Sequence, residues 1–280
     1  MKIAVYVGTV PETEVPYILL KESIRRFNNN IAVTECDQFN VKSGIDATPF
    51  SYNRVLIPLY EDFDNYDFVF YLDSDQIVIR DLTQQLKELN LSGNGFYSVN
   101  YDFDYFQSSV LLWDVRKFNK QNYVNKLSSI NITSYSVDEV TKILGVSECL
   151  GQEWNMLDWV DKNSIITHFT YMPTQPWINC NSILYKFYLK ESVNVFLSMS
   201  QPDKESFLSK LNSASVTGAI NYVFARDLVK HLGCIDIKIK KPLIFIPYWL
   251  IYNRRVPFNK LLFKMYFEFN KLYAKISKVL

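Results

Sequence analysis

The 280-residue sequence has little of what marks several common classes of protein. It contains only eight Gly and ten Pro, which excludes collagen-like and other fibrous chains. No stretch reaches the ~20 uninterrupted apolar residues of a membrane span, and the first apolar run is too short for a signal peptide. We therefore expect a cytoplasmic protein with one or two folded domains, because 48% of its residues are hydrophobic.

Cysteine and histidine are also scarce. The four cysteines are far apart in the sequence and form no CxxC pair: Cys36, Cys149, Cys180 and Cys234. This spacing favours free thiols in a reducing compartment over a disulfide framework. Of the two histidines, His168 ends an apolar run, whereas His231 resembles an ordinary histidine at the end of a helix.

Charge is unevenly distributed along a chain whose net charge is +1. From Lys238 to Leu280 there are ten Lys or Arg and one acid, so the rest has 20 basic and 28 acidic residues. Apolar residues of this tail lie near one helical face: Phe258, Leu262, Met265, Phe269, Leu272 and Ile276. At about 240–280 we expect either a helix attracted to an anionic membrane surface or a docked helix with a solvated basic face. We expect no nucleic-acid partner.

The first 35 residues predict a β-α-β unit. Residues 3–7 are typical of a strand closed by Gly8 and Thr9, and a helical pattern to about Phe27 leads to a second strand at 31–35. A Gly-containing turn after the first strand suits nucleotide binding at the carboxyl ends of parallel strands, although no GxGxxG motif is present. Further along, we expect a helix at 81–91, strands at 96–99 and 109–113, a helix beginning at 114–118, and helices over 183–231.

Residues 68–82, FVFYLDSDQIVIRDL, hold the main candidate site. A buried strand at 68–72 ends on Asp73-Ser74-Asp75, and an apolar pattern resumes at 77–79. Two carboxylates at a strand end are unfavourable unless something neutralises them, and oxygen ligands suit Mg²⁺ or Mn²⁺. The alternative is a loop in which Asp73 caps a turn and Asp75 is solvated.

Two further residues are candidates on chemical grounds. Arg54 lies in an apolar helical pattern, where its planar guanidinium is either solvated or placed beside a phosphate or an active-site carboxylate. His168 closes a predicted strand at 165–169 and is either a core histidine or a third metal ligand.

Four segments carry a resemblance to a known family: RVLIP at 54–58, FVFYLDSDQIVIRDL at 68–82, FQSSVLLWDVRKF at 106–118 and THFTYMPTQPW at 167–177. In their order and spacing the chain resembles glycosyltransferase family 8, the retaining GT-A group with glycogenin-like enzymes and bacterial lipopolysaccharide hexosyltransferases. The resemblance implies an α/β GT-A fold with a Rossmann-like mixed, mainly parallel sheet flanked by helices. It implies a catalytic domain at 1–180 and a helical carboxyl-terminal region at 181–280.

The same resemblance implies an activity and a set of site residues. The activity is metal-dependent transfer of a hexose, from UDP-glucose or UDP-galactose, to a glycan or glycolipid with retention. Asp73, Asp75 and His168 would bind Mn²⁺ or Mg²⁺. The other donor-site residues would be Gly8, Thr9, Arg54, Ser74, Ser108 and Gln175. Gln107, Glu153 and Asn155 would lie beside the transferred sugar or the acceptor.

Three departures from the family pattern point to a divergent branch. Gln175 stands where a lysine would contact the diphosphate, Glu153-Trp154-Asn155 replaces the usual Asp-Gln-Asp, and few residues separate Asn155 from His168. Two alternatives therefore stay open. One is another nucleotide-sugar or phosphosugar enzyme, although no basic phosphate loop follows the first strand. The other is a membrane-attached glycan-binding or scaffold protein with reduced catalysis, which the neutral Gln175 favours.

Overall fold

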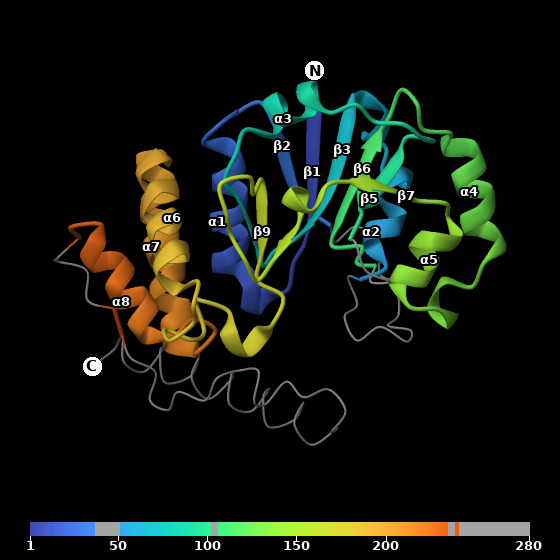
Figure 1. Cartoon of the computed structure of the whole chain (residues 1–280). Helices are drawn as coiled ribbons and strands as arrows, with labels where there is room; N and C mark the ends of the chain where they lie inside the picture. The colour runs from blue at the N-terminus through green and yellow to red at the C-terminus, as the bar shows by residue number, and fades with distance from the viewer. Residues whose placement is uncertain (37–50, 102–105, 235–238, 241–280) are drawn as a thin grey trace. The chain divides into compact units, whose positions relative to one another are not determined.

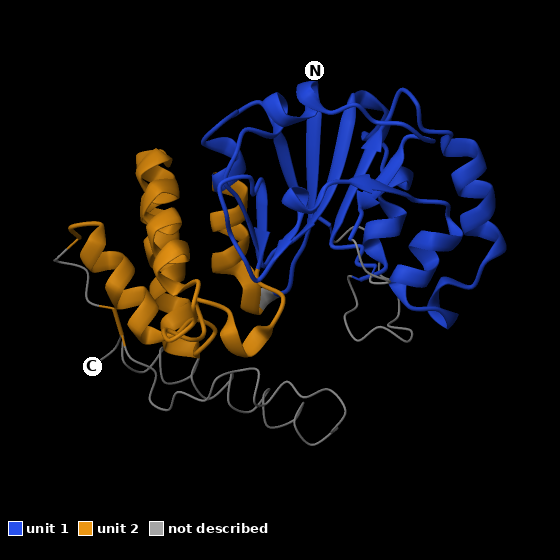
Figure 2. Ribbon diagram, in the orientation of Figure 1, with its two compact units in different colours: residues 1–10, 23–168 blue, residues 11–22, 169–280 orange. Residues whose placement is uncertain are grey.

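The computed structural model describes residues 1–36, 51–101, 106–234 and 239–240 (Figure 1). They belong to two compact units (Figure 2). The sheet unit comprises residues 1–10 and 23–168, and the helical unit comprises residues 11–22 and 169–280. Apart from Lys240, the basic tail predicted at 240–280 lies outside the described residues.

The sheet unit is built on a six-stranded sheet in the order β2-β1-β3-β6-β5-β7. Its strands are β1 (Ile3–Gly8), β2 (Ala32–Glu35), β3 (Phe68–Asp73), β5 (Phe96–Val99), β6 (Val110–Asp114) and β7 (Ser147–Leu150). β6 runs antiparallel to both of its neighbours, and the remaining neighbouring pairs are parallel. The prediction of a mixed, mainly parallel sheet is therefore confirmed.

The neighbouring strands β1 and β3 are apolar because both of their faces are covered. β1 is buried along its whole length, and so is β3 up to its last residue. They pair in parallel register, which sets Gly8 opposite Asp73. The carboxyl ends of β1 and β3 are therefore adjacent, at the edge where open α/β sheets bind their ligands.

A second, three-stranded sheet brings distant parts of the chain to this edge. It consists of β4 (Gln76–Val78), β8 (Met156–Leu157) and β9 (Ile166–His168), in the order β4-β9-β8. β4 pairs antiparallel with β9 and sets Gln76 opposite His168. The strand predicted at 165–169 is present as β9, and the apolar pattern at 77–79 overlaps β4, whereas β7 and β8 were not predicted from the sequence.

Helices connect the strands of the sheet unit and make up most of the described helical unit. The α-helices are α1 (Glu14–Arg25), α2 (Asn53–Leu56), α3 (Leu82–Glu88), α4 (Lys120–Ser129), α5 (Val137–Ile143), α6 (Tyr185–Ser198), α7 (Gln201–Thr217) and α8 (Tyr222–His231). The 3-10 helices are η1 (Pro11–Thr13), η2 (Ile57–Leu59), η3 (Phe63–Asn65), η4 (Ile132–Ser134), η5 (Gln152–Trp154) and η6 (Met172–Thr174).

The predicted helix start at 114–118 is wrong. Asp114 ends β6, and its carbonyl oxygen accepts hydrogen bonds from the backbone N–H groups of Lys117 and Phe118, which makes a turn. α4 begins only at Lys120, after Asn119 caps its first turn by accepting from the Asn122 N–H at 3.0 Å. The cap, rather than the preceding acidic residue, decides where the helix begins.

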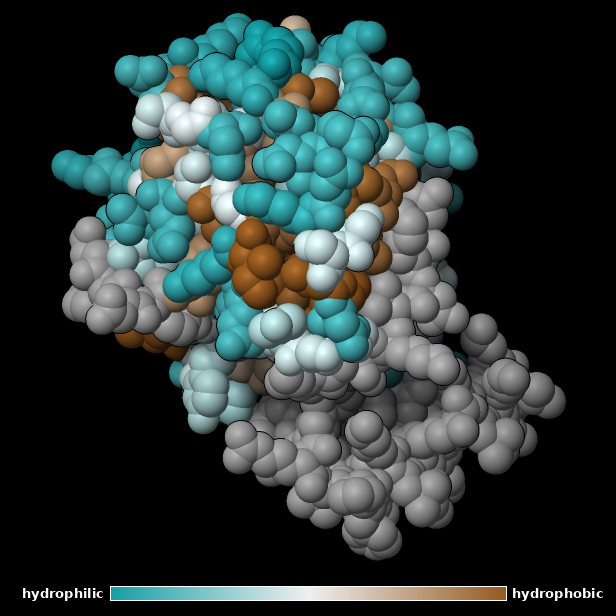
Figure 3. Space-filling view, turned by 90° about the vertical axis from the view of Figure 1, so that its right-hand side faces the viewer, coloured by the Kyte–Doolittle hydropathy of each residue, from teal (hydrophilic) through white to brown (hydrophobic). Residues whose placement is uncertain are grey.

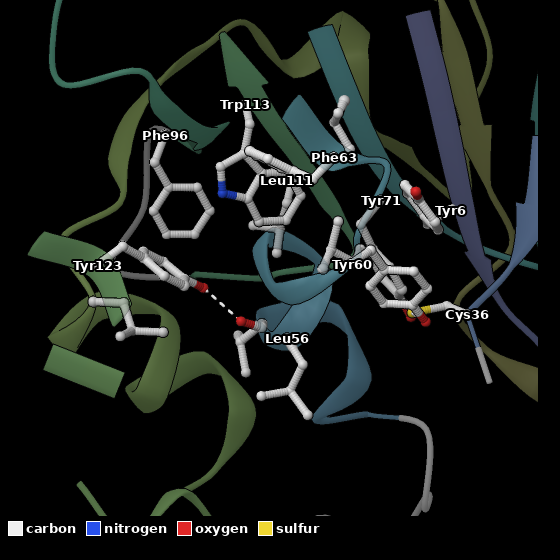
Figure 4. Packing of buried hydrophobic residues seen from close by; sticks show 14 of the residues in the cluster. Tyr6, Cys36, Leu56, Tyr60, Phe63, Tyr71, Phe96, Leu111, Trp113 and Tyr123 are labelled. Carbon is white, nitrogen blue, oxygen red and sulfur yellow. Dashed lines mark hydrogen bonds between the residues drawn. The ribbon is translucent and has the colours of Figure 1, made fainter. Parts of the chain in front are cut away.

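Helix α2 is held against the sheet by an aromatic cluster (Figure 4). The rings of Phe96 and Trp113 are stacked with centroids 5.0 Å apart, and Tyr123 meets Phe96 edge to face. The buried Tyr123 hydroxyl donates to the Val55 carbonyl oxygen at 2.8 Å, so it fixes the position of α2. This cluster therefore fixes the position of Arg54, which lies in α2.

In the helical unit, an aromatic group packs against α6 and α8. Phe169 and Trp177 both contact Tyr188, which in turn contacts Phe224. Ser200 caps α7, and Gly218 ends it in a left-handed conformation. Within the described part of the chain, none of the helices is long and apolar enough to cross a bilayer. The face seen in Figure 3 is largely hydrophilic, with hydrophobic areas between the hydrophilic ones.

Candidate active site

Two carboxylates and an imidazole converge at the carboxyl end of β3. Asp73 is the last residue of β3, Asp75 precedes β4, and His168 ends β9. Each offers a ligand atom, and the three atoms lie within 4.8 Å of one another. The sequence prediction that these three residues come together is confirmed.

His168 and Asp75 form a close pair. The ring nitrogen Nε2 lies 3.1 Å from Oδ1 of Asp75, and the histidine side chain is only 3% exposed. Burial by itself lowers the pKa of His168, but the carboxylates of Asp75 and Asp73 outweigh burial and raise it above the usual value. The two carboxylates therefore stabilise the protonated, positively charged form of His168.

Asp73 is mostly enclosed and is held by two donors. Its Oδ1 accepts from the Tyr71 hydroxyl at 2.5 Å and from Nη2 of Arg54 at 3.1 Å. Burial raises the pKa of Asp73, the neighbouring Asp75 raises it further, and the Arg54 guanidinium opposes both. A carboxylate in this setting is stabilised by any added positive charge.

Arg54 is a structural centre rather than a solvated side chain. Nη1 donates to the carbonyl oxygen of Ser108 at 2.9 Å and to its Oγ at 3.2 Å, while Nη2 reaches Asp73. The guanidinium carbon also lies 4.5 Å from the centre of the Tyr71 ring. The Arg54 guanidinium thus lies beside the carboxylate of Asp73, and its role in a donor site stays a prediction.

Asp138 is a residue of this site that the sequence did not reveal. Its Oδ1 accepts from the backbone N–H of Ser108 at 2.9 Å and from the Ser108 Oγ at 2.5 Å. The capping box of α5 is made by Ser136 and Glu139, so Asp138 is not needed as a cap. An acid at the second position of a helix whose cap is already complete was the available signal.

Asn155 lies behind His168, away from solvent. It is fully buried, its Oδ1 is 3.1 Å from Nδ1 of His168, and its Nδ2 donates to the Tyr101 hydroxyl and to Ser109 Oγ. Its predicted role beside the acceptor stays a prediction, but its contacts all point into the protein.

Three predicted donor residues lie at the same sheet edge. Gly8 ends β1, and its carbonyl oxygen accepts from the Ser74 N–H at 3.2 Å. The Thr9 hydroxyl donates to Glu35 at 3.1 Å. These contacts join the ends of β1, β2 and β3, while the predicted contacts with a nucleoside stay predictions.

The remaining predicted residues are less tightly placed. Gln107 is half-buried, and its Oε1 is buried without a hydrogen-bond partner among the described residues. The Glu153 carboxylate folds back over Gly151, where an added Cβ would lie 2.2 Å from Oε2. Gln175 belongs to the helical unit, is 3% exposed, and donates from Nε2 to the Phe169 carbonyl oxygen at 2.9 Å. Their roles toward donor and acceptor stay predictions.

The donor set of the cluster fits a divalent cation. Two carboxylates supply hard oxygen ligands, and the imidazole adds a nitrogen that Mg²⁺ rarely takes. Nε2 of His168 and Oδ1 of Asp75 lie 3.1 Å apart, so a single cation could contact both groups. The group could therefore bind a metal.

Comparisons with known proteins agree with the fold. No model of a protein family matches the sequence, and no curated protein matches it. Among solved structures, a bifunctional glycosyltransferase, WbbM, has a TM-score of 0.54 at 14% identity, covering 75% of this chain and 51% of its own. The glycosyltransferase GlyE of Streptococcus pneumoniae TIGR4 has a TM-score of 0.50 at 18% identity, covering 69% of this chain and 60% of its own.

The chain thus spans between half and three fifths of the length of these two neighbours. The galactosyltransferase LgtC, solved with donor and acceptor sugar analogues, is also matched, with a TM-score of 0.45 at 15% identity. It covers 69% of this chain and 95% of its own. The sheet, its flanking helices and the likenesses to WbbM and GlyE together show that the chain has the GT-A glycosyltransferase fold.

Proposed function

We propose that the protein is a metal-dependent glycosyltransferase that moves a hexose from a nucleotide sugar to a glycan or glycolipid with retention. The observation that carries the proposal is the Asp73, Asp75 and His168 cluster at the carboxyl end of β3 in a GT-A fold. Fold alone would not suffice, because unrelated activities share folds. The resemblance to family 8 supports UDP-glucose or UDP-galactose as the donor and a catalytic domain at residues 1–180.

The proposed cofactor is Mn²⁺, with Mg²⁺ as the second choice, because the imidazole of His168 suits Mn²⁺ better than Mg²⁺. A bound cation would neutralise the negative charge of the diphosphate leaving group. Asp73 and Asp75 would hold the cation from the sheet side, and His168 from β9.

The chain's own residues have distinct proposed roles around this site. Arg54 spans Ser108 and Asp73, so it keeps Asp73 ionised and oriented rather than reaching out as a free phosphate ligand. Gly8, Thr9 and Ser74 would border the nucleoside. Gln107, with a buried acceptor oxygen that lacks a partner, would accept a hydrogen bond from the sugar. Glu153 and Gln175 keep their predicted places beside acceptor and diphosphate as proposals only.

The proposed acceptor is at or near a membrane. The tail at 240–280 would be attracted to anionic lipid at the inner face of a membrane, since its basic residues far outnumber its acidic ones. A glycolipid acceptor would be presented at the same surface.

The test is release of UDP from UDP-glucose and UDP-galactose with and without Mn²⁺. We expect turnover that needs Mn²⁺ and that Asp73→Asn lowers by at least about 100-fold, since the cation ligand is lost. Asp64→Asn is the matched control, because Asp64 is an exposed carboxylate of the same unit that pairs with Lys120. No Mn²⁺-dependent turnover with either donor would contradict the proposal.

A protein that binds glycans with reduced catalysis is the second candidate. The observation that favours it is Gln175, which has no charge and uses its Nε2 within the protein. Such a protein would retain saturable binding to a glycan array but release no UDP. Gln175→Lys would then be the variant to examine for restored turnover.

A further inference from the structure

We propose that Asn155 is a positioning residue that fixes His168 in the tautomer with its proton on Nδ1. In that tautomer the lone pair of Nε2 faces Asp75 and is ready to take a cation. The inference rests on the proposed function only for the identity of the cation. The tautomer itself is inferred from the structure. It follows from hydrogen bonds to backbone carbonyl oxygens, which can accept but cannot donate.

The backbone carbonyl oxygen of Ser109 can only accept a hydrogen bond. Gln76 lies 3.2 Å from this oxygen, so the contacting atom of Gln76 is its amide nitrogen, Nε2. The same Nε2 also lies 3.2 Å from the side-chain amide of Asn155. Because Nε2 donates, the atom of Asn155 that faces it must be the oxygen, Oδ1.

A second set of hydrogen bonds includes the backbone carbonyl oxygen of Asn155 itself. It accepts from the Tyr101 hydroxyl at 3.0 Å, which leaves the lone pairs of the Tyr101 oxygen to accept from the Asn155 side chain at 2.6 Å. The atom of Asn155 facing Tyr101 must therefore be Nδ2. Both sets of hydrogen bonds require the same orientation of the Asn155 amide. In the opposite orientation, Nδ2 of Asn155 would face Nε2 of Gln76, and both are donors.

The consequence falls on His168. Oδ1 of Asn155 lies 3.1 Å from Nδ1 of His168 and can only accept, so Nδ1 carries a hydrogen. In a neutral ring that assignment leaves Nε2 as a bare acceptor, 3.1 Å from Oδ1 of Asp75. Two acceptors at this distance repel unless a proton or a cation joins them.

Burial makes this arrangement rigid. Gln76, Ser109, Asn155 and His168 are each no more than 3% exposed. Turning Asn155 toward an acceptor sugar would break its hydrogen bonds to Gln76, Ser109 and His168. Partners of this kind behind a metal-binding histidine typically change metal affinity by 10–100-fold.

The experiment uses the full chain labelled with ¹⁵N at histidine. The sequence has only two histidines, and His231→Gln, which lies on the exposed end of α8, identifies the signals of His168 by difference. Spectra of the metal-free protein, recorded over a pH series that extends above the folded pKa of His168, report which nitrogen is protonated in the neutral ring. We expect Nδ1–H in the wild type, and Nε2–H would overturn the proposal.

Three variants distinguish an effect of Asn155 on the tautomer of His168 from an effect on protein stability alone. Asn155→Leu removes the acceptor, so we expect a mixture of tautomers. Asn155→Asp keeps an acceptor at the same place and should retain Nδ1–H. Ser109→Ala removes one bond to Nδ2 of Asn155 but leaves Oδ1 facing His168, so we expect lower stability with an unchanged tautomer.

Affinity for Mn²⁺, measured by calorimetry without any sugar donor, gives a second readout. We expect Asn155→Leu to bind Mn²⁺ about 10–100-fold more weakly, and Asn155→Asp and Ser109→Ala to stay within a few-fold of the wild type. Equal affinity and an unchanged tautomer in Asn155→Leu would overturn the proposal. Absence of UDP release with an intact tautomer and Mn²⁺ affinity would count against the proposed function alone.

Discussion

Asp138 accepts two hydrogen bonds from Ser108, one from the backbone N–H at 2.9 Å and one from Oγ at 2.5 Å. The carbonyl oxygen of Ser108 in turn accepts from Arg54, and Arg54 donates to Asp73. A residue at the start of α5 is thereby connected to a carboxylate of the metal cluster. Charges alternate along this chain of contacts, which is favourable in a largely buried region.

Asp138→Ala should lower Mn²⁺ affinity although Asp138 is not one of the proposed metal ligands. The substitution leaves the buried N–H of Ser108 without its acceptor, which costs about 1–3 kcal/mol of unfolding free energy. Release of Ser108 should also loosen Arg54 and Asp73, so we expect weaker Mn²⁺ binding by calorimetry. Glu139→Ala on the same helix removes only the capping box and should leave Mn²⁺ affinity unchanged. Equal Mn²⁺ affinity in both variants would argue against the connection.

Stability of the metal-free protein should depend on pH through His168. Its pKa is raised in the folded state, so its contribution is fully present below the unfolded value of about 6.5 and is lost as pH rises through the folded pKa. The difference in Tm between the wild type and His168→Gln, measured in EDTA, should therefore shrink from about pH 6 to about pH 9. A difference that grows with pH would contradict this sign, and His231→Gln is the matched control.

Mn²⁺ binding should show the opposite trend. The cation must displace the proton on His168 and compete with protonation of Asp73, whose pKa burial also raises. We therefore expect Mn²⁺ affinity to increase as pH rises over the same interval, with proton release measurable by calorimetry in buffers of different ionisation enthalpy. Affinity independent of pH would mean that His168 is not a ligand.

Gly95→Ala should be far more damaging than Gly233→Ala. Both glycines have a positive φ, of 86° and 67°, so either substitution costs about 1–2 kcal/mol in backbone strain. At Gly95 the new Cβ would also lie 2.5 Å from the backbone nitrogen of Phe118, whereas at Gly233 no atom of the described residues lies within 4 Å. We expect about 1–3 kcal/mol of additional loss at Gly95, measured by urea unfolding. Similar losses at both positions would contradict the close approach of the two segments.

Removal of the tail should abolish binding to anionic vesicles. A chain ending at Lys240 loses most of the excess of basic residues and all of the predicted apolar face. Flotation with vesicles of phosphatidylcholine, with and without phosphatidylglycerol, measures the effect. We expect the full chain to bind only the anionic vesicles. A full chain that ignores them would show that the interfacial helix is wrong.

Local sequence patterns predicted much of the fold. The apolar run before Asp73 indicated a buried strand, and β3 follows it because a strand covered on both faces must be apolar throughout. The end of that strand marked Asp73 and Asp75 as candidates, and the apolar run that ends on His168 marked the histidine as a candidate third ligand. The helix start expected at 114–118 failed because a turn closed on the Asp114 carbonyl oxygen delays α4 to Lys120.

Contacts between distant residues were beyond the reach of those patterns. Arg54 meets Ser108 across 54 positions and Ser108 meets Asp138 across 30, and neither distance leaves any local periodic signal. Asn155 was predicted beside an acceptor, yet its side chain turns inward to His168 and Gln76. Which polar neighbours face each other depends on how strands and helices pack.

The sequence by itself determined that a strand ends in two carboxylates, because hydrophobic periodicity and the chemistry of the side chains are local properties. Only the tertiary structure decided what surrounds those carboxylates. Pairing of β4 with β9 sets His168 beside Asp75, and packing of α2 on the sheet brings Arg54 to Asp73. Both depend on sheet register and on helix packing, which arise from the whole core at once rather than from any single segment.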